Sequence, residues 1–168
     1  MITIFVDMDG VLAEFDVTFL KLYGEFGKES FKKFVTDGYF LSLPMMPRAK
    51  ELVERLNSFD VNIEVLSSLG NVENLEWAAE QKRTWLINNG INWHPNFTQH
   101  KGLKRNFANN CSILLDDTNI NVVEFSVNGF SILYKEENFD TMMTMLEALV
   151  NKLKSERNSG IYKVERFA

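Results

Sequence analysis

The segment Ile2-Thr3-Ile4-Phe5-Val6-Asp7-Met8-Asp9-Gly10 gives the strongest indication of the fold. Residues 2–6 are apolar or β-branched, which is typical of a strand buried on both faces of a parallel sheet. The strand is expected to stop at Asp7, where Asp7 and Asp9 stand beside a glycine that permits a sharp turn. A lone Asp-x-Asp pair also occurs in turns and helix caps, so its meaning depends on what the rest of the chain brings to it.

Two further strands are expected to end in polar residues. Residues 61–66 form one candidate strand, followed directly by Ser67 and Ser68, and residues 112–115 form another that runs into Asp116 and Asp117. Their apolar and β-branched character is that of buried strands. Because ligands of open α/β sheets bind outside the carboxyl ends of the strands, these polar clusters are predicted to converge with Asp7 on one edge of a sheet.

Helical patterns alternate with these strands. Apolar residues at helical spacing, capping residues and glycine stops predict helices near 49–56, 72–89 and 121–127, a short strand at 131–134 and a closing helix from Phe139. Strands that alternate with helices favour an α/β fold with a parallel sheet. One domain core is expected, since 168 residues with 45% hydrophobic content can bury a single sizeable core.

Residues 14–46 are too long for a simple connection between the first strand and its helix, because such connections usually take about 2–6 residues. Their aromatic side chains suggest a small helical cap that closes over the site, although the same rings could pack a core of their own. The aromatic residues of this segment are Phe15, Phe19, Tyr23, Phe26, Phe31, Phe34, Tyr39 and Phe40.

Composition excludes several function classes. A net charge of -5 and a pI near 5.1 argue against long nucleic acids as partners, since their binders gather Lys and Arg on one face. No apolar run approaches the roughly 20 residues that span a bilayer, and no basic segment precedes an apolar one at the N-terminus. We expect a soluble, cytoplasmic protein without a membrane partner.

The remaining reactive side chains give weaker signals. Cys111 precedes an apolar run and is expected to be a small buried hydrophobic residue. His94 and His100 are expected in a polar loop, without the spacing of metal ligands, and residues 155–168 give no chemical signal. The four carboxylates at the two strand ends are different, because together they would repel strongly without a cation. Their hard oxygen atoms suit Mg²⁺ as the cofactor.

The polar clusters resemble, in order, the motifs of the haloacid dehalogenase superfamily. Asp7-Met8-Asp9-Gly10-Val11 is similar to the first motif, Ser67 after Val65-Leu66 to the second, a lysine to the third, and Leu114-Leu115-Asp116-Asp117 to the fourth. The resemblance implies an α/β, Rossmannoid three-layer sandwich with a mostly parallel sheet and a small helical cap inserted after the first strand. It implies a catalytic core from residues 1–13 and 47–168, and a cap from residues 14–46.

A narrower resemblance is to the 5'(3')-deoxyribonucleotidases of phage and bacterial type. Three stretches carry it: Asp7 to Phe15, Tyr39 to Pro47, and Lys104 to Ala108. The resemblance implies that Phe15, Tyr39 and Phe40 contact the nucleoside, with Ser68 among the substrate-binding residues.

The resemblance also implies a mechanism. Asp7 would attack phosphorus and form an aspartyl-phosphate, while Asp9 would protonate the leaving oxygen and activate water. Ser67 would bind phosphate oxygens, and Lys104, with Lys101 as its rival, would supply a fixed positive charge. The magnesium ligands would be Asp7, Asp9, Asp116 and Asp117, with Asp9 acting through its carbonyl and Asp117 as the direct carboxylate ligand of the acidic pair.

We therefore expect a magnesium-dependent phosphatase of nucleoside monophosphates. Alternatives are a phosphatase of the same fold that acts on another small metabolite or on a nucleic-acid end, and a non-catalytic binding module. Retention of every charged position argues against the last, because a scaffold has no reason to keep repelling carboxylates together. The oligomeric state stays open, with a homodimer among the alternatives.

Overall fold

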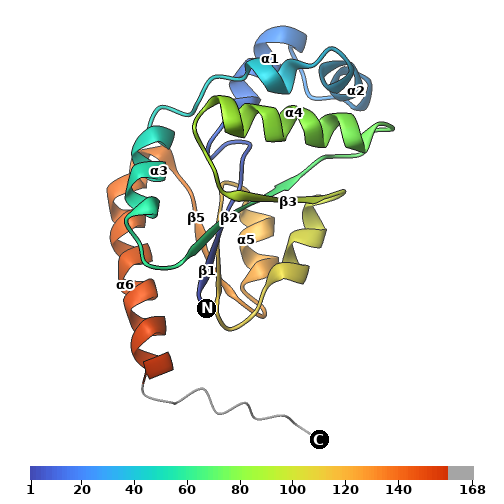
Figure 1. Ribbon diagram of the computed structural model, residues 1–168. Helices are drawn as coiled ribbons and strands as arrows, with labels where there is room; N and C mark the ends of the chain where they lie inside the picture. The colour runs from blue at the N-terminus through green and yellow to red at the C-terminus, as the bar shows by residue number, and fades with distance from the viewer. Residues whose placement is uncertain (159–168) are drawn as a thin grey trace, which may run out of the picture.

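A five-stranded parallel sheet with the strand order β3-β2-β1-β4-β5 forms the centre of the molecule. The computed structural model describes residues 1–158, and Figure 1 shows the sheet between its covering helices. All the strand pairs within this sheet are parallel. The strands are β1 (Thr3–Val6), β2 (Asn62–Ser68), β3 (His94–Thr98), β4 (Ser112–Asp116) and β5 (Phe130–Leu133).

Helices cover both faces of the sheet and form the outer layers. Figure 1 shows α3 and α6 side by side on one face and α5 on the other, with α4, α1 and α2 gathered at one end. The α-helices are α1 (Phe15–Tyr23), α2 (Lys28–Thr36), α3 (Ala49–Asn57), α4 (Leu75–Asn88), α5 (Asn119–Phe125) and α6 (Phe139–Asn158). Short 3-10 helices are η1 (Tyr39–Ser42), η2 (Lys101–Phe107) and η3 (Glu136–Asn138).

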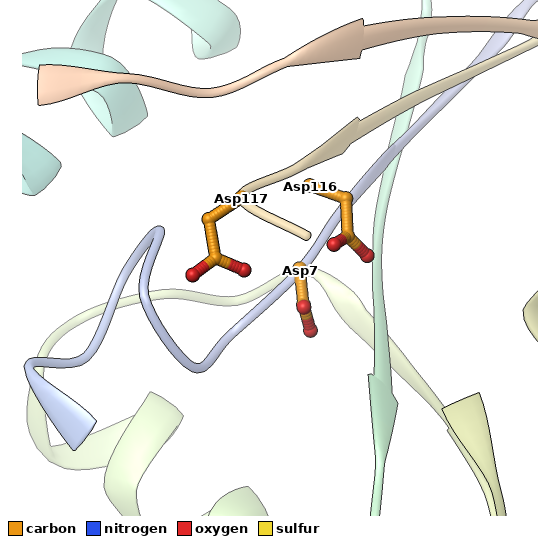
Figure 2. A group of neighbouring side chains, drawn as sticks. All are labelled: Asp7, Asp116 and Asp117. Carbon is orange, nitrogen blue, oxygen red and sulfur yellow. The ribbon is translucent and has the colours of Figure 1, made fainter. Parts of the chain in front are cut away.

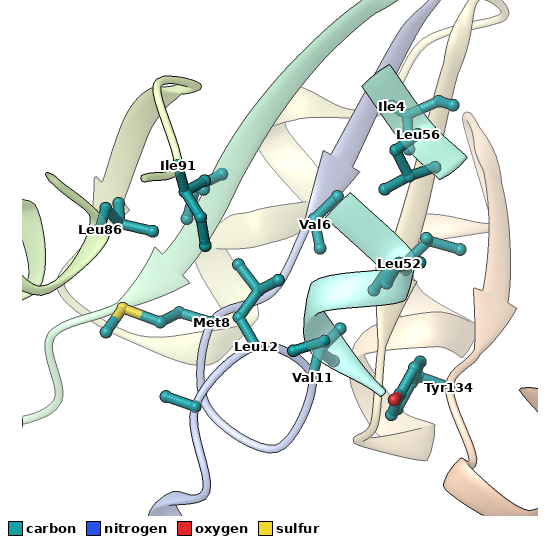
Figure 3. Packing of buried hydrophobic residues seen from close by; sticks show 14 of the residues in the cluster. Ile4, Val6, Met8, Val11, Leu12, Leu52, Leu56, Leu86, Ile91 and Tyr134 are labelled. Carbon is teal, nitrogen blue, oxygen red and sulfur yellow. The ribbon is translucent and has the colours of Figure 1, made fainter. Parts of the chain in front are cut away.

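The period-2 alternation of side chains along β1 explains why both sheet faces are covered. Ile4 and Val6 point into the larger buried cluster, together with residues of α3, α4 and α6, as Figure 3 shows in part. Phe5 points the other way, into a smaller cluster with Leu114 and Phe125. An apolar run without polar interruptions is what a central strand with two buried faces requires.

The segment between β1 and α3 folds as helices α1 and α2 followed by η1, and we call it the insertion (residues 14–46). Its buried rings Phe19, Phe34 and Phe40 belong to the same cluster as the core of the sheet. Helix α4 holds the insertion by two side-chain hydrogen bonds. Gln81 Nε2 donates to the carbonyl of Val35 at 2.8 Å, and Trp85 Nε1 donates to that of Leu43 at 2.7 Å.

The predicted elements are present, with one addition. Strand β3 was not predicted, and the prediction that His94 lies in a polar loop is wrong, because this residue begins β3. The strand lies at the edge of the sheet, where one side needs no partner, so its sequence His-Pro-Asn-Phe-Thr lacks the apolar run of a central strand. Within residues 1–158, no helix has the length and hydropathy needed to cross a bilayer.

Candidate active site

Strands β1 and β4 bring three carboxylates together at the carboxyl edge of the sheet. Val6 pairs with Leu115, and the amide of Asp7 donates to the carbonyl of Leu115 at 2.9 Å, so Asp7 and the Asp116-Asp117 pair leave adjacent strands at the same level. Oxygen atoms of the three carboxylates lie within 4.8 Å of one another. Figure 2 shows the three side chains around one common space. The predicted convergence of these residues is therefore present in the structure.

Lys104 occupies the buried side of this group. Its Nζ lies 2.7 Å from Asp7 Oδ2 and 2.7 Å from Asp116 Oδ2, and its side chain is almost fully buried. Burial by itself would lower the pKa of Lys104, but the charges of Asp7 and Asp116 together raise it above its ordinary value. Lys101, the alternative candidate, is exposed and lines the pocket above the site. Of the two lysines, Lys104 is the one beside Asp7.

Asp116 and Asp117 differ in how many protein donors they have. Asp116 Oδ1 accepts from the amide of Thr118 at 2.9 Å, Oδ2 accepts from Lys104 at 2.7 Å, and Asn121 Nδ2 donates to both oxygens at 3.0 Å. Asp117, by contrast, accepts only a 3.2 Å hydrogen bond from the Thr118 hydroxyl within residues 1–158. A ligand at this edge would therefore find free oxygen atoms on Asp117 rather than on Asp116.

The electrostatics of the acidic pair are unfavourable without a cation. Burial, followed by the nearby charge of Asp7, raises the pKa of both Asp116 and Asp117 from 3.8 to about 6. A bound cation would stabilise the ionised form of both carboxyl groups and so lower their pKa values. Three converging carboxylates also supply the hard oxygen donors that Mg²⁺ prefers. The residues present therefore fit the predicted metal.

Gly10 allows Asp117 to approach the loop after β1. Its φ of +77° lies in the left-handed region that glycine adopts most easily. A Cβ atom at this position would lie 2.1 Å from Asp117 Oδ2, which is far inside contact distance. The glycine thus serves both the turn and the position of the Asp117 carboxylate.

Asp9 points away from the acidic group and toward helix α4. Its Oδ2 accepts a 2.7 Å hydrogen bond from Lys82, whereas its Oδ1 is buried and has no hydrogen-bond partner within residues 1–158. Burial raises the pKa of Asp9 above its ordinary value, and the charge of Lys82 opposes that rise. The Asp9 side chain is thus not one of the converging carboxylates, and its predicted metal contact was through the backbone carbonyl only.

Lys82 is a residue of this site that the sequence analysis missed. It is fully buried, and besides Asp9 it donates to Ser67 Oγ at 2.9 Å and to the carbonyl of Ser68 at 3.1 Å. A signal was present in the sequence. Lys82 lies four residues after Ala78 and four before Leu86, so it falls on the face of α4 that those residues bury. A lysine on such a stripe needs acceptors, and these are at the ends of β1 and β2.

Several of the candidate residues line one pocket of about 740 Å³. Its polar floor includes Asp7, Asp9 and Ser68, whereas Ser67 is fully buried behind them. Its apolar wall comes from the insertion. The phenylalanines of that wall are Phe15, Phe19, Phe26 and Phe31.

Of the three residues predicted to contact the nucleoside, one lines the pocket and two do not. Phe15 lines the pocket, but Tyr39 and Phe40 are not among its lining residues. Phe40 is fully buried and its ring stacks on Phe15 at 5.8 Å, so it does not reach the pocket in this structure, and its contact with substrate stays a prediction. Phe26, which is 56% exposed, and Phe31 occupy the wall instead. The reason is that η1 lies between α2 and α4 and turns its rings inward rather than toward the pocket.

Comparisons with known proteins support the fold. No protein-family model and no curated protein sequence matches the chain. A hydrolase from Streptococcus pneumoniae TIGR4 matches with a TM-score of 0.53 and 11% identity, over 84% of this chain and 97% of that one. D,D-heptose 1,7-bisphosphate phosphatase from Burkholderia thailandensis matches with a TM-score of 0.48 and 12% identity, over 77% and 75%. The predicted fold class, an α/β sandwich around a parallel sheet, is confirmed.

Proposed function

We propose that this protein is a phosphatase that hydrolyses nucleoside monophosphates, with Asp7 as the nucleophile. The observation that carries this proposal is the arrangement around Asp7. A buried lysine lies 2.7 Å from one of its oxygen atoms, an acidic pair lies beside it, and a second aspartate that lines the same pocket follows two residues later. A turn or a helix cap needs none of these neighbours.

The residues divide the reaction into two steps. Asp7 attacks phosphorus, so that the bond from phosphorus to the leaving oxygen breaks while an aspartyl-phosphate forms. Asp9, which lines the pocket two residues after Asp7, gives its proton to the leaving oxygen. Water then attacks the aspartyl-phosphate, and Asp9 takes the proton of that water. Asp7 and Asp9 return to their starting states, and the products are an alcohol and phosphate.

The electrostatic part of the reaction falls to Lys104 and the acidic group. Lys104 fixes the orientation of Asp7 and places a positive charge beside the transferring phosphoryl group. Asp7 and Asp117, with the backbone carbonyl of Asp9, would hold Mg²⁺, and Asp116 would orient the group through its own hydrogen bonds. The ion would neutralise negative charge, so that an anionic nucleophile can meet an anionic substrate.

The pocket favours a substrate with a flat apolar part. Its volume of about 740 Å³ falls in the range of small-molecule sites and exceeds what phosphate alone would fill. The phenylalanines of its wall offer ring faces and edges above the polar floor. Base stacking on such rings is worth about 1–3 kcal/mol per base in single-strand binding, which sets the scale for a nucleobase here.

One screen tests the proposal. Phosphate release is measured across deoxyribonucleoside and ribonucleoside monophosphates, sugar phosphates and p-nitrophenyl phosphate, with Mg²⁺ and with EDTA. We expect release with Mg²⁺ only, and the highest kcat/KM for nucleoside monophosphates. A preference for a sugar phosphate over every nucleotide would replace the substrate class and leave the phosphatase. No release from any substrate with Mg²⁺ would refute both.

A further inference from the structure

Lys82 has as many acceptors as its ammonium group has protons. An ammonium carries three N–H donors and no acceptor. The three acceptors are Asp9 Oδ2 at 2.7 Å, Ser67 Oγ at 2.9 Å and the carbonyl of Ser68 at 3.1 Å. Its Nζ also lies 4.5 Å from the ring centre of Phe40. Lys82 therefore has no donor left for a substrate, in contrast to Lys104, which has two carboxylate partners among the described residues.

These contacts decide what Asp9 and Ser67 can do. Because Lys82 can only donate, the Ser67 oxygen must be the acceptor in their hydrogen bond, and the Ser67 hydrogen stays free to donate elsewhere. Lys82 also donates to Oδ2 of Asp9, whereas the buried Oδ1 has no hydrogen-bond partner among residues 1–158. One side chain thereby fixes the orientation of the Asp9 carboxyl group and makes Ser67 a donor.

Helix α4 gives Lys82 a fixed position. The residues around it on the helix, Gln81 and Trp85, hydrogen-bond to backbone carbonyls of the insertion, at Val35 and Leu43. Phe40 of η1 closes the remaining side of the lysine. Helix α4 thus contacts both the insertion and the ends of β1 and β2, and the buried ammonium group of Lys82 lies where they meet.

We propose that Lys82 is a positioning residue that holds Asp9 for proton transfer to the leaving group. This inference rests on the proposed function, since it assigns a part in that reaction. Lys82 does not touch the substrate and acts only through Asp9 and Ser67. Replacing Lys82 should therefore lower kcat/KM most for substrates whose leaving oxygen needs a proton in order to depart.

The test compares two aryl phosphates of similar size. p-Nitrophenolate leaves readily without a proton, whereas phenolate does not, so general acid catalysis matters more for phenyl phosphate. We expect Lys82→Met, which keeps the chain length and removes the charge, to lower kcat/KM for phenyl phosphate at least about tenfold more than for p-nitrophenyl phosphate. The quantity kcat/KM reports the first phosphoryl transfer whichever step limits turnover.

A double variant separates positioning from general damage. If Lys82 acts through Asp9, Asp9→Asn/Lys82→Met should show the same ratio between the two substrates as Asp9→Asn alone, because the route is already lost. The double variant removes both charges of the pair, so it remains informative if Lys82→Met folds poorly by thermal unfolding. In that case a further change in the ratio on adding Lys82→Met to Asp9→Asn would overturn the inference.

The outcomes also separate this inference from the proposed function. An active wild type whose Lys82→Met variant loses both substrates equally would overturn the inference alone. A wild type that releases phosphate from neither aryl phosphate nor any nucleotide would overturn the proposed function and this inference with it. Lys82→Arg restores the charge, and partial recovery of the substrate ratio relative to Lys82→Met would support positioning.

Discussion

The sheet edge and the insertion meet at one pocket but are built in different ways. At the sheet edge, polar side chains are fixed by short hydrogen bonds from their neighbours, as Asp116 is by three donor residues. In the insertion, rings are fixed by contact with other rings. Phe15 lies between 5.3 and 6.4 Å from five other phenylalanine rings.

This contrast predicts which substitutions each region tolerates. A charged side chain held by hydrogen bonds tolerates few replacements, because a substitution that removes one donor or acceptor leaves its partner unsatisfied. At the sheet edge, such a substitution is expected to abolish the role of that side chain. A cluster of rings can be filled in several ways, since apolar residues of similar volume often replace one another at under about 1.5 kcal/mol. We therefore expect large effects from substitutions at the sheet edge and graded ones in the insertion.

Replacing Asp7 by Asn should give the largest effect. The amide keeps the shape of the side chain but loses the nucleophile, so kcat should fall more than about 10³-fold, or about 4 kcal/mol. Asp16→Asn is the matched control, because Asp16 lines the same pocket from α1 and is exposed. We expect its kcat to change little. Retention of a tenth of the wild-type rate in Asp7→Asn would remove Asp7 as nucleophile.

Gly10→Ala should cost about 10²-fold in kcat/KM, because the new Cβ would displace the Asp117 carboxylate and a shift of about 1 Å suffices for such a loss. The matched control is Gly90→Ala. Gly90 has a similar φ of +71°, but a Cβ there would meet nothing within 4 Å. Both variants carry a backbone strain of about 1–2 kcal/mol. Equal activity in the two variants would show that backbone strain alone, and not Asp117, explains the need for Gly10.

In the insertion, Phe26→Ala should lower kcat/KM for nucleoside monophosphates about tenfold, within the range of a stacking contact. Phe26 is a cleaner choice than Phe15, because it is 56% exposed and contacts two phenylalanine rings, Phe15 and Phe19, whereas Phe15 contacts five. p-Nitrophenyl phosphate should be affected less, since a small ester draws no binding energy from a base.

The control for Phe26 is Leu22→Ala. Leu22 is a 45% exposed residue of α1 that does not line the pocket. Its truncation should change neither substrate. If Phe26→Ala harms both substrates equally, the ring supports the insertion and does not contact the nucleoside.

The same contrast explains what the sequence could predict. The sheet edge was predictable, because buried strands have a clear apolar pattern and their ends must meet at one edge, so that Asp7, Ser67 and Asp116 could be placed together. The edge strand β3 was not, since its sequence His-Pro-Asn-Phe-Thr has no apolar run, unlike Phe-Ser-Ile-Leu of the other edge strand, β5. Lys82 was missed because long-range partners of a helical lysine depend on how α4 packs, although its apolar neighbours at helical spacing were visible.

The insertion was predictable in its existence and not in its details. The length of residues 14–46 and their aromatic content indicated a helical segment, and helices α1 and α2 are present there. The sequence could not predict which rings face the pocket, because packing between aromatic rings leaves no regular spacing of residues along the chain. Phe40 was therefore assigned to the substrate although it is buried against Lys82. The part of the predicted C-terminal segment from 159 to 168 lies outside the described residues.

The smallest expected effect concerns protons and Mg²⁺ at the acidic pair. The pKa of Asp117 is raised from 3.8 to about 6, mainly by burial and then by the charge of Asp7. A raised carboxylate pKa means that the metal-free fold binds protons more tightly than the unfolded chain. This contribution to stability is full below pH 3.8 and is lost as the pH rises through about 6.

Magnesium must compete with that proton, so its stabilising effect should have the opposite pH dependence. At about pH 5 roughly nine in ten Asp117 side chains are protonated, which weakens a site that needs the carboxylate by about tenfold, or about 1.4 kcal/mol. The rise in Tm on adding saturating Mg²⁺ should therefore be larger at pH 7.5 than at pH 5, by about 3–6 °C. Asp117→Asn should lose both the rise and its pH dependence, whereas Asp16→Asn should keep them. An equal rise at the two pH values in wild type would mean that Asp117 does not bind the ion, and the division of roles between Asp116 and Asp117 would then have to be reversed.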